Sequence, residues 1–311
     1  MSDQATLEAA GLSGHGIAPP EATDEAATPV DPTGGARRRG RGQGVLLRLA
    51  TGWLIFVTVA AITAPWLPIP DPESQDLANR LAGPFTEGHL LGTDGLGRDI
   101  LARLAWGARV SLIISLAAVS IGMFVGGTIG MVVGYLRGIA EGVVMWAINV
   151  LLAFPGLVLL LGLVAFVGQS LLAITLVVGF LSIPTYARVA RATTLTVAQR
   201  EYVQAARALG ASRGRILVRE ILPNVVLPVA AFGLVALGVI IVLEGSLAFL
   251  GLSVKAPSPT WGSMIAEGRR HLDETAHLSL VPAAAMFLTV LAVNFVGDAL
   301  RSRFDVREAT L

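Results

Sequence analysis

The residues with the most reactive side chains are few and scattered. Three histidines, His89, His271 and His277, fall in polar segments, and Asp273 and Glu274 lie near the last two. Imidazole and carboxylate groups can hold a divalent metal, but such sites use close, regular spacing such as His-Glu-x-x-His. No comparable spacing occurs here, so we expect no metal site.

Thiol and nucleotide chemistry have even less support. The chain has no cysteine, which excludes disulfides and thiolate ligands. Its single lysine, Lys255, does not belong to the Gly-Lys-Ser/Thr pattern of a phosphate-binding loop. We therefore expect no thiol chemistry and no ATP binding through such a loop. The net charge of +1 says little, because the charges are unevenly placed. No nucleic-acid partner is expected.

The composition is typical of a protein embedded in a membrane. Hydrophobic residues make up 54% of the chain and charged residues only 14%, against about 25% in soluble domains. The mean hydropathy is +0.70. So few charges could hardly cover a water-exposed surface, and we expect an all-α integral membrane protein.

Six segments are apolar and long enough to cross about 30 Å of hydrocarbon as helices. The first carries Trp53 and Trp66 near its ends, as interfacial aromatic residues would be. Pro155 interrupts the third. The predicted spans are residues 49–68, 110–135, 143–167, 171–186, 225–250 and 278–300.

The remaining segments complete the expected organisation. Residues 1–44 form a disordered tail, 45–109 the first span with a long outer loop, 110–300 the core, and 301–311 a short tail. With six spans both termini share one side, and most arginines fall on that side. The positive-inside rule therefore places both termini in the cytoplasm. We expect a multi-pass protein of the bacterial cytoplasmic membrane.

Two features inside the spans could carry structure or function. Glycines recur every fourth residue in the second span, at Gly122, Gly126, Gly130 and Gly134, and should let another helix of this chain or a partner approach closely. A carboxylate, Glu244, lies inside the fifth span. It either lines a substrate path or forms a structural ion pair with Arg98 or Arg109.

The loop between the fourth and fifth spans contains two short predicted helices. The first, 199–210, ends at Gly210, where a positive φ suits glycine, and carries one apolar stripe. Ser212 could cap the second, 213–222, which Pro223 should stop. From the residues alone, the loop either docks on a partner or lies on the bilayer with its arginines at phosphates. The stripe consists of Tyr202, Ala205, Ala206 and Leu209.

Residues 201–224 resemble the EAA loop of ABC-importer permeases. The matching features are Ala205-Ala206, Gly210 and Leu222-Pro223, whereas Gln204 replaces the family's Glu and Glu220 an apolar residue. The resemblance implies that this loop forms the coupling helix that docks in a groove of the ATPase. The residues it assigns to coupling are Tyr202, Val203, Gln204, Ala205, Ala206, Leu209, Gly210, Arg213 and Arg215.

Three further blocks, residues 89–112, 246–269 and 297–305, are similar to the C-type permease subunit of dipeptide, oligopeptide and nickel importers. The resemblance implies a type I importer permease that forms half of a peptide pathway, is not an enzyme and binds no cofactor itself. Its partners would be a second, B-type permease, two ATPase domains that bind ATP and Mg²⁺, and an extracytoplasmic substrate-binding lipoprotein. Nickel or glutathione is the alternative substrate. A self-contained secondary transporter should instead show inverted repeats and several intramembrane charges.

Overall fold

The computed structural model describes residues 36–308. Most of the predicted disordered tail, residues 1–35, lies outside the described residues, as do 309–311. Residues 42–311 form one compact unit, and residues 1–41 belong to another. Helix α1 runs from Ala36 to Thr63, so residues 36–44, predicted as tail, are helical. Helix α11, His277–Glu308, likewise includes most of the predicted C-terminal tail.

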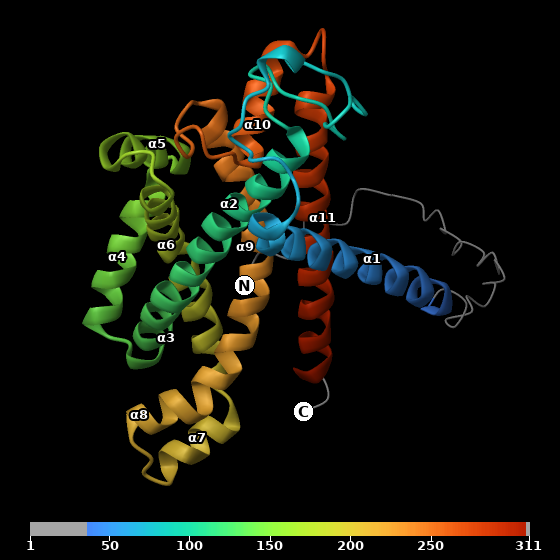
Figure 1. Ribbon diagram of the computed structural model, residues 1–311. Coiled ribbons are helices and arrows are strands. Elements are labelled where there is room, and N and C mark those ends of the chain that lie inside the picture. The colour runs from blue at the N-terminus through green and yellow to red at the C-terminus, as the bar shows by residue number, and fades with distance from the viewer. Residues whose placement is uncertain (1–35, 309–311) are drawn as a thin grey trace, which may run out of the picture. The chain divides into compact units, whose positions relative to one another are not determined.

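The described chain is all-helical, as predicted (Figure 1). Five helical stretches are long and apolar enough to cross a membrane, and a bent pair brings the possible total to six. Within residues 36–308 the only β contacts are two isolated bridges, Thr86 with His89 and Thr93 with Asp99. The five stretches are Gly44–Trp66, Ile100–Leu136, Leu171–Val197, Arg213–Phe249 and His277–Ser302.

The predicted third span is not one straight helix. Helix α4 covers Ile139–Ala153 and α5 covers Gly156–Val167, and the two are bent by 89°. Pro155 explains the break, because its ring disfavours helical geometry at the preceding residue. Phe154 accordingly has φ −74° and ψ 139°, an extended conformation.

The second span begins ten residues earlier than predicted, with α2 at Ile100–Ile121. The carboxylate of Asp99 caps it, accepting a hydrogen bond of 2.7 Å from the Ala102 N–H. A π turn, Gly122–Gly126, connects α2 to α3 at Gly127–Leu136. The predicted span began only after Arg109, because a spanning segment was expected to contain no charge. The structure instead places Arg103 inside the helix and pairs it with Asp94 and Glu267.

The glycine series of the second span faces α6, Leu171–Val197, of the same chain. A Cβ on Gly122 would meet the Tyr186 ring, and one on Gly134 would lie 3.3 Å from the Arg191 Cα. Gly126 and Gly130 lie against the backbone of Ile183 and Ala187. Glycine here permits backbone-to-backbone packing that any side chain would block.

Pro223 does not stop a helix, contrary to the prediction. Helix α8, Arg213–Ile216, continues through a π turn, Leu217–Ile221, into α9, Leu222–Phe249. Pro223 lies in the first turn of α9, the part of a helix that tolerates proline best. It cannot donate to the Arg219 carbonyl, and the wider π turn immediately before α9 accommodates that loss.

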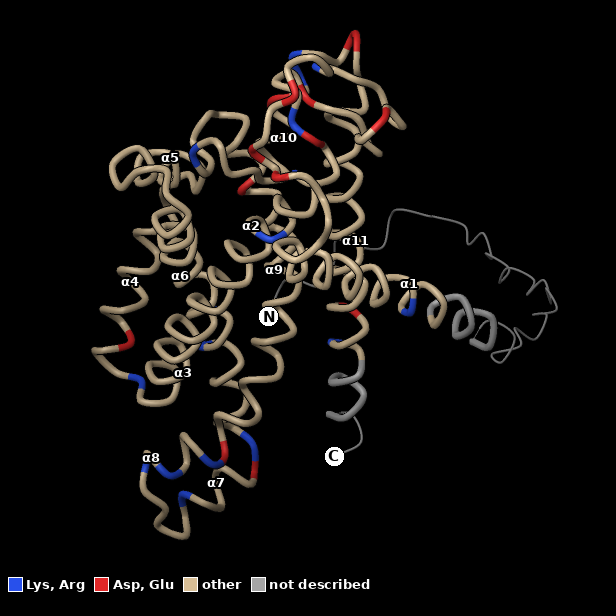
Figure 2. Tube along the Cα trace, viewed as in Figure 1, with Lys and Arg blue, Asp and Glu red and all other residues tan. Residues whose placement is uncertain are grey.

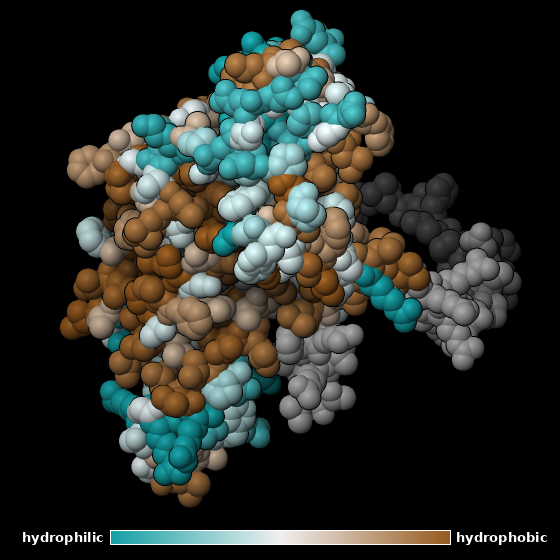
Figure 3. All heavy atoms as spheres, viewed as in Figure 1, coloured by the Kyte–Doolittle hydropathy of each residue, from teal (hydrophilic) through white to brown (hydrophobic). Residues whose placement is uncertain are grey.

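The polar parts lie at the two ends of the spans (Figures 2 and 3). Helix α7, Glu201–Ala208, and α8 form one end, where arginines gather. At the other lie the outer loop with its 3₁₀ turn Leu77–Asn79, helix α10, Trp261–Gly268, and the turn Arg269–His271. A further 3₁₀ turn, Ala64–Trp66, directly follows α1. Between the ends the visible surface is largely hydrophobic.

Candidate functional site

The most deeply buried side chain of α7 is Val203. Val203 is fully buried and packs in a cluster with Val197 of α6, Ile216 of α8 and Ile221. The helix is therefore held between the end of α6 and the start of the α8–α9 rod. Val203 thus links α7 to two segments that run into the spanning helices α6 and α9.

Gly210 ends α7 in the way that the sequence predicted. Its φ is +80°, in the left-handed region. The Gly210 N–H donates to the Arg207 carbonyl at 3.0 Å, and the Ala211 N–H to the Ala206 carbonyl at 3.1 Å. This pair of bonds is a Schellman motif. The Ser212 side chain then accepts a hydrogen bond from the Arg215 N–H and caps α8, also as predicted.

Part of the outward surface of α7 and its C-terminal end is apolar. Leu209 is 87% exposed, Tyr202 is 43% exposed, and Ala205 is exposed between them. Ala206 is half-buried against the Val203 cluster, so the predicted stripe wraps partly inward. Sequence reasoning placed Val203 among the coupling residues but did not foresee that it is the inward anchor.

The polar coupling residues surround this surface. Gln204, Arg213 and Arg215 are exposed. Arg207 lies over the Tyr135 ring at the end of α3, with 5.8 Å from its guanidinium carbon to the ring centroid. That contact ties α7 to a third spanning segment.

Glu244 forms no ion pair with Arg98 or Arg109, which corrects one of the two predicted roles. It is 1% exposed and accepts hydrogen bonds from Ser253 at 2.7 Å and Ser111 at 3.3 Å. Ser111 also accepts the Trp261 N–H at 3.3 Å. The carboxylate thus joins α9, α2 and the start of α10 through hydroxyls, and its predicted place on a substrate path stays a prediction.

Arg98 has other partners. It bonds Asp94 through Nε at 2.7 Å and Glu267 of α10 through Nη2 at 2.8 Å. Arg103, which sequence reasoning did not single out, bonds the same Glu267 oxygen at 3.0 Å. Arg109 instead stacks on Trp106, 5.6 Å from the ring centroid. The missed signal was the placement of two arginines five residues apart at a helix start, able to reach one acid.

The histidines lie apart from one another in the described residues. His89 Nδ1 bonds Asp99 at 2.9 Å, beside the cap of α2, and His271 lies against Gly95. His277 starts α11. Within residues 36–308, no three histidine or acidic side chains are grouped as a metal site requires.

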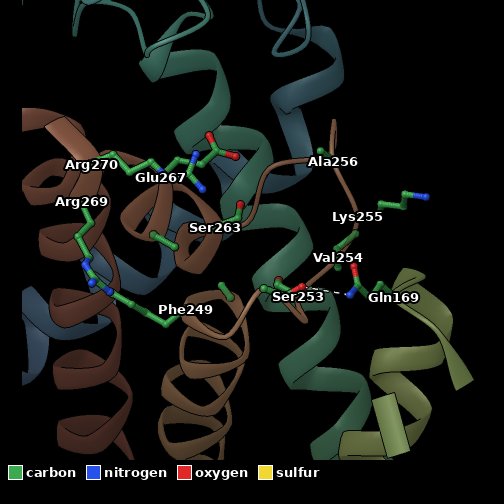
Figure 4. Close-up of a pocket in the computed structure, with 13 residues that line it drawn as sticks. Gln169, Phe249, Ser253, Val254, Lys255, Ala256, Ser263, Glu267, Arg269 and Arg270 are labelled. Carbon is green, nitrogen blue, oxygen red and sulfur yellow. Dashed lines mark hydrogen bonds between the residues drawn. The ribbon is translucent and has the colours of Figure 1, made fainter. Parts of the chain in front are cut away.

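A cavity of about 660 Å³ opens between the ends of α9 and α10 and the α5–α6 connection (Figure 4). The segment after α9 is fixed there, because the Lys255 N–H donates to the Gln169 carbonyl at 3.0 Å and the Gln169 amide to Gly251 at 3.1 Å. In Figure 4, Lys255 extends away from the side of the cavity that holds Glu267 and Arg270.

These features define a multi-spanning helical membrane protein with a short, partly exposed helix at one end. The chain belongs to the family described as binding-protein-dependent transport system inner membrane component, whose model matches residues 126–309. It is therefore a permease subunit of an ABC importer.

Two similar proteins align with most of the chain. Glutathione transport system permease protein GsiD of Pectobacterium atrosepticum is 38% identical over 83% of this chain and 86% of its own. The protein of the same name from Escherichia coli O6:K15:H31 is 39% identical over 86% and 88%.

A solved structure shares the fold. The MetNI methionine ABC transporter in inward-facing conformations contains a chain that aligns with a TM-score of 0.52 at 16% identity. The alignment covers 64% of this chain and 95% of that one.

Proposed function

We propose that this chain forms half of a transmembrane pathway for short peptides and couples it to ATP hydrolysis through α7. A second, B-type permease would complete the pathway, and two ATPase domains would bind ATP and Mg²⁺ on the cytoplasmic side. A substrate-binding lipoprotein would deliver the peptide from outside. The chain itself would hold no cofactor and catalyse no reaction.

One observation carries the coupling role. The outward side of α7 presents Leu209 and Ala205 to solvent, while Val203 and the Schellman motif fix the helix from within. A helix that merely lay on lipid would gain little from such rigid attachment to α6 and α9. A helix that receives a push from a partner needs it, because a loose attachment would absorb the motion.

Glutathione fits best among short peptides. The relatives described above are named for glutathione transport, and they cover most of this chain. Glutathione is a tripeptide with two carboxylates and one amine, so it carries a net negative charge near neutral pH. The arginines at the outer end of the spans suit such a ligand electrostatically. Nickel remains the alternative that the resemblance leaves.

Both termini are proposed to lie in the cytoplasm. In the described chain, α7 and α8 carry arginines at the same end of the spans as the start of α4, with Arg137 close by. The positive-inside rule favours that end as cytoplasmic. The loop that contains Asp94 and the helix α10 would then face outward.

The test is uptake by the whole importer. The chain would be purified with its partner subunits, reconstituted in vesicles and supplied with its binding protein and ATP. We expect ATP-dependent uptake of labelled glutathione or a dipeptide that excess unlabelled peptide abolishes. Uptake of Ni²⁺ in the absence of peptide, with no peptide uptake, would overturn the substrate proposal.

A further inference from the structure

The basic residues of the outer loops are not spread evenly. All of them except Arg109 line one of two adjoining cavities beside α10. Glu267 and Arg270 contribute to both cavities, and Figure 4 shows these two side chains at the edge of the larger one. The smaller cavity, which we call the arginine cavity, has the more enclosed charges.

The arginine cavity has a volume of about 440 Å³, within the range of small-ligand pockets. It lies between residues 80–103 and the α10 segment that ends at His271. Two of its guanidinium groups are buried, since Arg98 is 5% and Arg103 is 2% exposed. Its charged lining consists of Arg80, Asp94, Arg98, Arg103, Glu267 and Arg270.

The two acids pair with the two buried arginines, but not completely. Glu267 Oε2 accepts bonds from Arg98 and Arg103, and Asp94 Oδ2 accepts one from Arg98 Nε at 2.7 Å. Arg103 Nη1 is buried without a hydrogen-bond partner among the described residues. Buried polar groups are nearly always paired in native proteins, so this donor calls for an acceptor.

Two further arginines add charge that the acids do not balance. Arg80 and Arg270 are exposed and line the same cavity. Arg80 donates through Nε to the Gly95 carbonyl, which directs its guanidinium toward the cavity lining. In the described part of the chain, no salt bridge within 4 Å includes either residue. The cavity therefore has a net positive charge and a spare buried donor.

We propose that the arginine cavity binds a carboxylate group of a small peptide, with Arg103 Nη1 as the buried donor and Arg80 and Arg270 at the rim. Guanidinium groups hold carboxylates with charge-assisted hydrogen bonds and a planar geometry. Arg103 lines this 440 Å³ cavity although it is only 2% exposed, so a carboxylate that entered the cavity would approach its guanidinium group. This inference rests on the proposed function only in taking the ligand to be the transported peptide.

Protection from an arginine reagent tests the site by binding. The whole importer complex, without its binding protein, would be treated with phenylglyoxal, and modification of Arg80 and Arg270 followed by mass spectrometry. The probes are glutathione and Ala-Ala, each compared with its carboxylate ester. We expect the free acids to slow modification of both arginines several-fold and the esters to leave it unchanged. Arg109, outside both cavities, should react at the same rate throughout.

Equal protection by acids and esters, or no protection at all, would overturn the proposal. A variant of Arg103 tests the role of the buried donor. Arg103→Lys keeps the charge beside Glu267 but loses the planar fork. The complex should still assemble, while protection of Arg80 and Arg270 by the free acids falls several-fold. Unchanged protection in this variant would exclude Arg103 as the donor.

The experiments distinguish a failure of the cavity proposal from a failure of the transport proposal. If the wild-type importer takes up glutathione but glutathione protects neither rim arginine, the cavity proposal alone is wrong. If the free acids protect Arg80 and Arg270 while no peptide is taken up, the cavity proposal stands and the transport proposal is wrong.

Discussion

Gly130 of α3 lies directly against the backbone of Ala187 in α6. A Cβ on Gly130 would come within 2.8 Å of the Ala187 carbonyl carbon, closer than backbone atoms permit. The two spanning helices are therefore in contact through their main chains at this point. Helix α6, which leads into α7, is therefore packed tightly against α3.

We predict that Gly130→Ala destabilises the permease, because the added methyl group must push α3 away from α6. Overpacking of this kind typically costs about 1–3 kcal/mol. Gly127→Ala is the matched control, because its Cβ would meet only Val229 Cγ1 at an ordinary 3.8 Å. Thermal unfolding of the purified complex should show a lower Tm for the first variant only; equal Tm values would contradict the close packing.

Leu209 should matter for the partner and not for the fold. It is 87% exposed, so Leu209→Ala removes almost no internal contact and should leave the Tm unchanged. If it fills a pocket of the ATPase, copurification of the ATPase subunits should fall several-fold. Leu272→Ala, at an exposed leucine of the outer loop, should leave copurification intact. Loss of copurification in both variants, or in neither, would argue against a local docking contact.

Glu244 should act as a structural acceptor for hydroxyl groups. Glu244→Ala leaves Ser253 and Ser111 without their buried acceptor, a loss of about 1–3 kcal/mol. Glu244→Gln retains one acceptor oxygen and should recover much of that stability. The Tm values of the two variants in the assembled complex decide this. If Glu244→Gln were as unstable as Glu244→Ala, the carboxylate charge itself would be what the site requires.

The orientation of the chain can be read by labelling. Ser74 and Ser212 are both exposed, and the absence of native cysteine gives a clean background. In sealed cells, a Ser74→Cys variant should react with an impermeant maleimide, and a Ser212→Cys variant should react only after permeabilisation. Reaction of the latter in intact cells would reverse the topology and remove α7 from the ATPase side.

The sequence predicted the parts of the fold that depend on local physics. Apolar length identified five spans and a sixth segment that the structure bends, and the glycine period indicated a close helix contact. The ending of α7 at Gly210 and the cap at Ser212 followed from their preferred backbone conformations. Each of these depends on residues adjacent in the chain, so no knowledge of the tertiary structure was needed.

The remainder depended on which segments meet in space. Ser111 and Ser253 bond Glu244 from distant parts of the chain, and no spacing reveals that hydroxyls rather than Arg98 reach it. The effect of each proline on its helix could not be predicted, because it depends on the position of the proline within the helix. Pro155 breaks a helix into a pair bent by 89°, whereas Pro223 occupies a first turn, where proline is tolerated.

The central claim is that α7 couples ATP hydrolysis to the spanning helices, and Gly210 tests it most directly. No atom lies within 4 Å of an added Cβ at Gly210, so only its φ of +80° penalises a side chain. Gly210→Val should distort the Schellman motif, whereas Gly210→Asn should be tolerated, since asparagine adopts this conformation.

The measurement is transport-stimulated ATP hydrolysis in the reconstituted importer, together with copurification of the ATPase subunits. We predict that Gly210→Val loses both, that Gly210→Asn retains both, and that the triple variant Arg213→Gln, Arg215→Gln, Arg219→Gln is less impaired than Gly210→Val. Full ATPase association and stimulation in Gly210→Val, with the arginine variant impaired instead, would show that the loop lies on lipid and is not the coupling element.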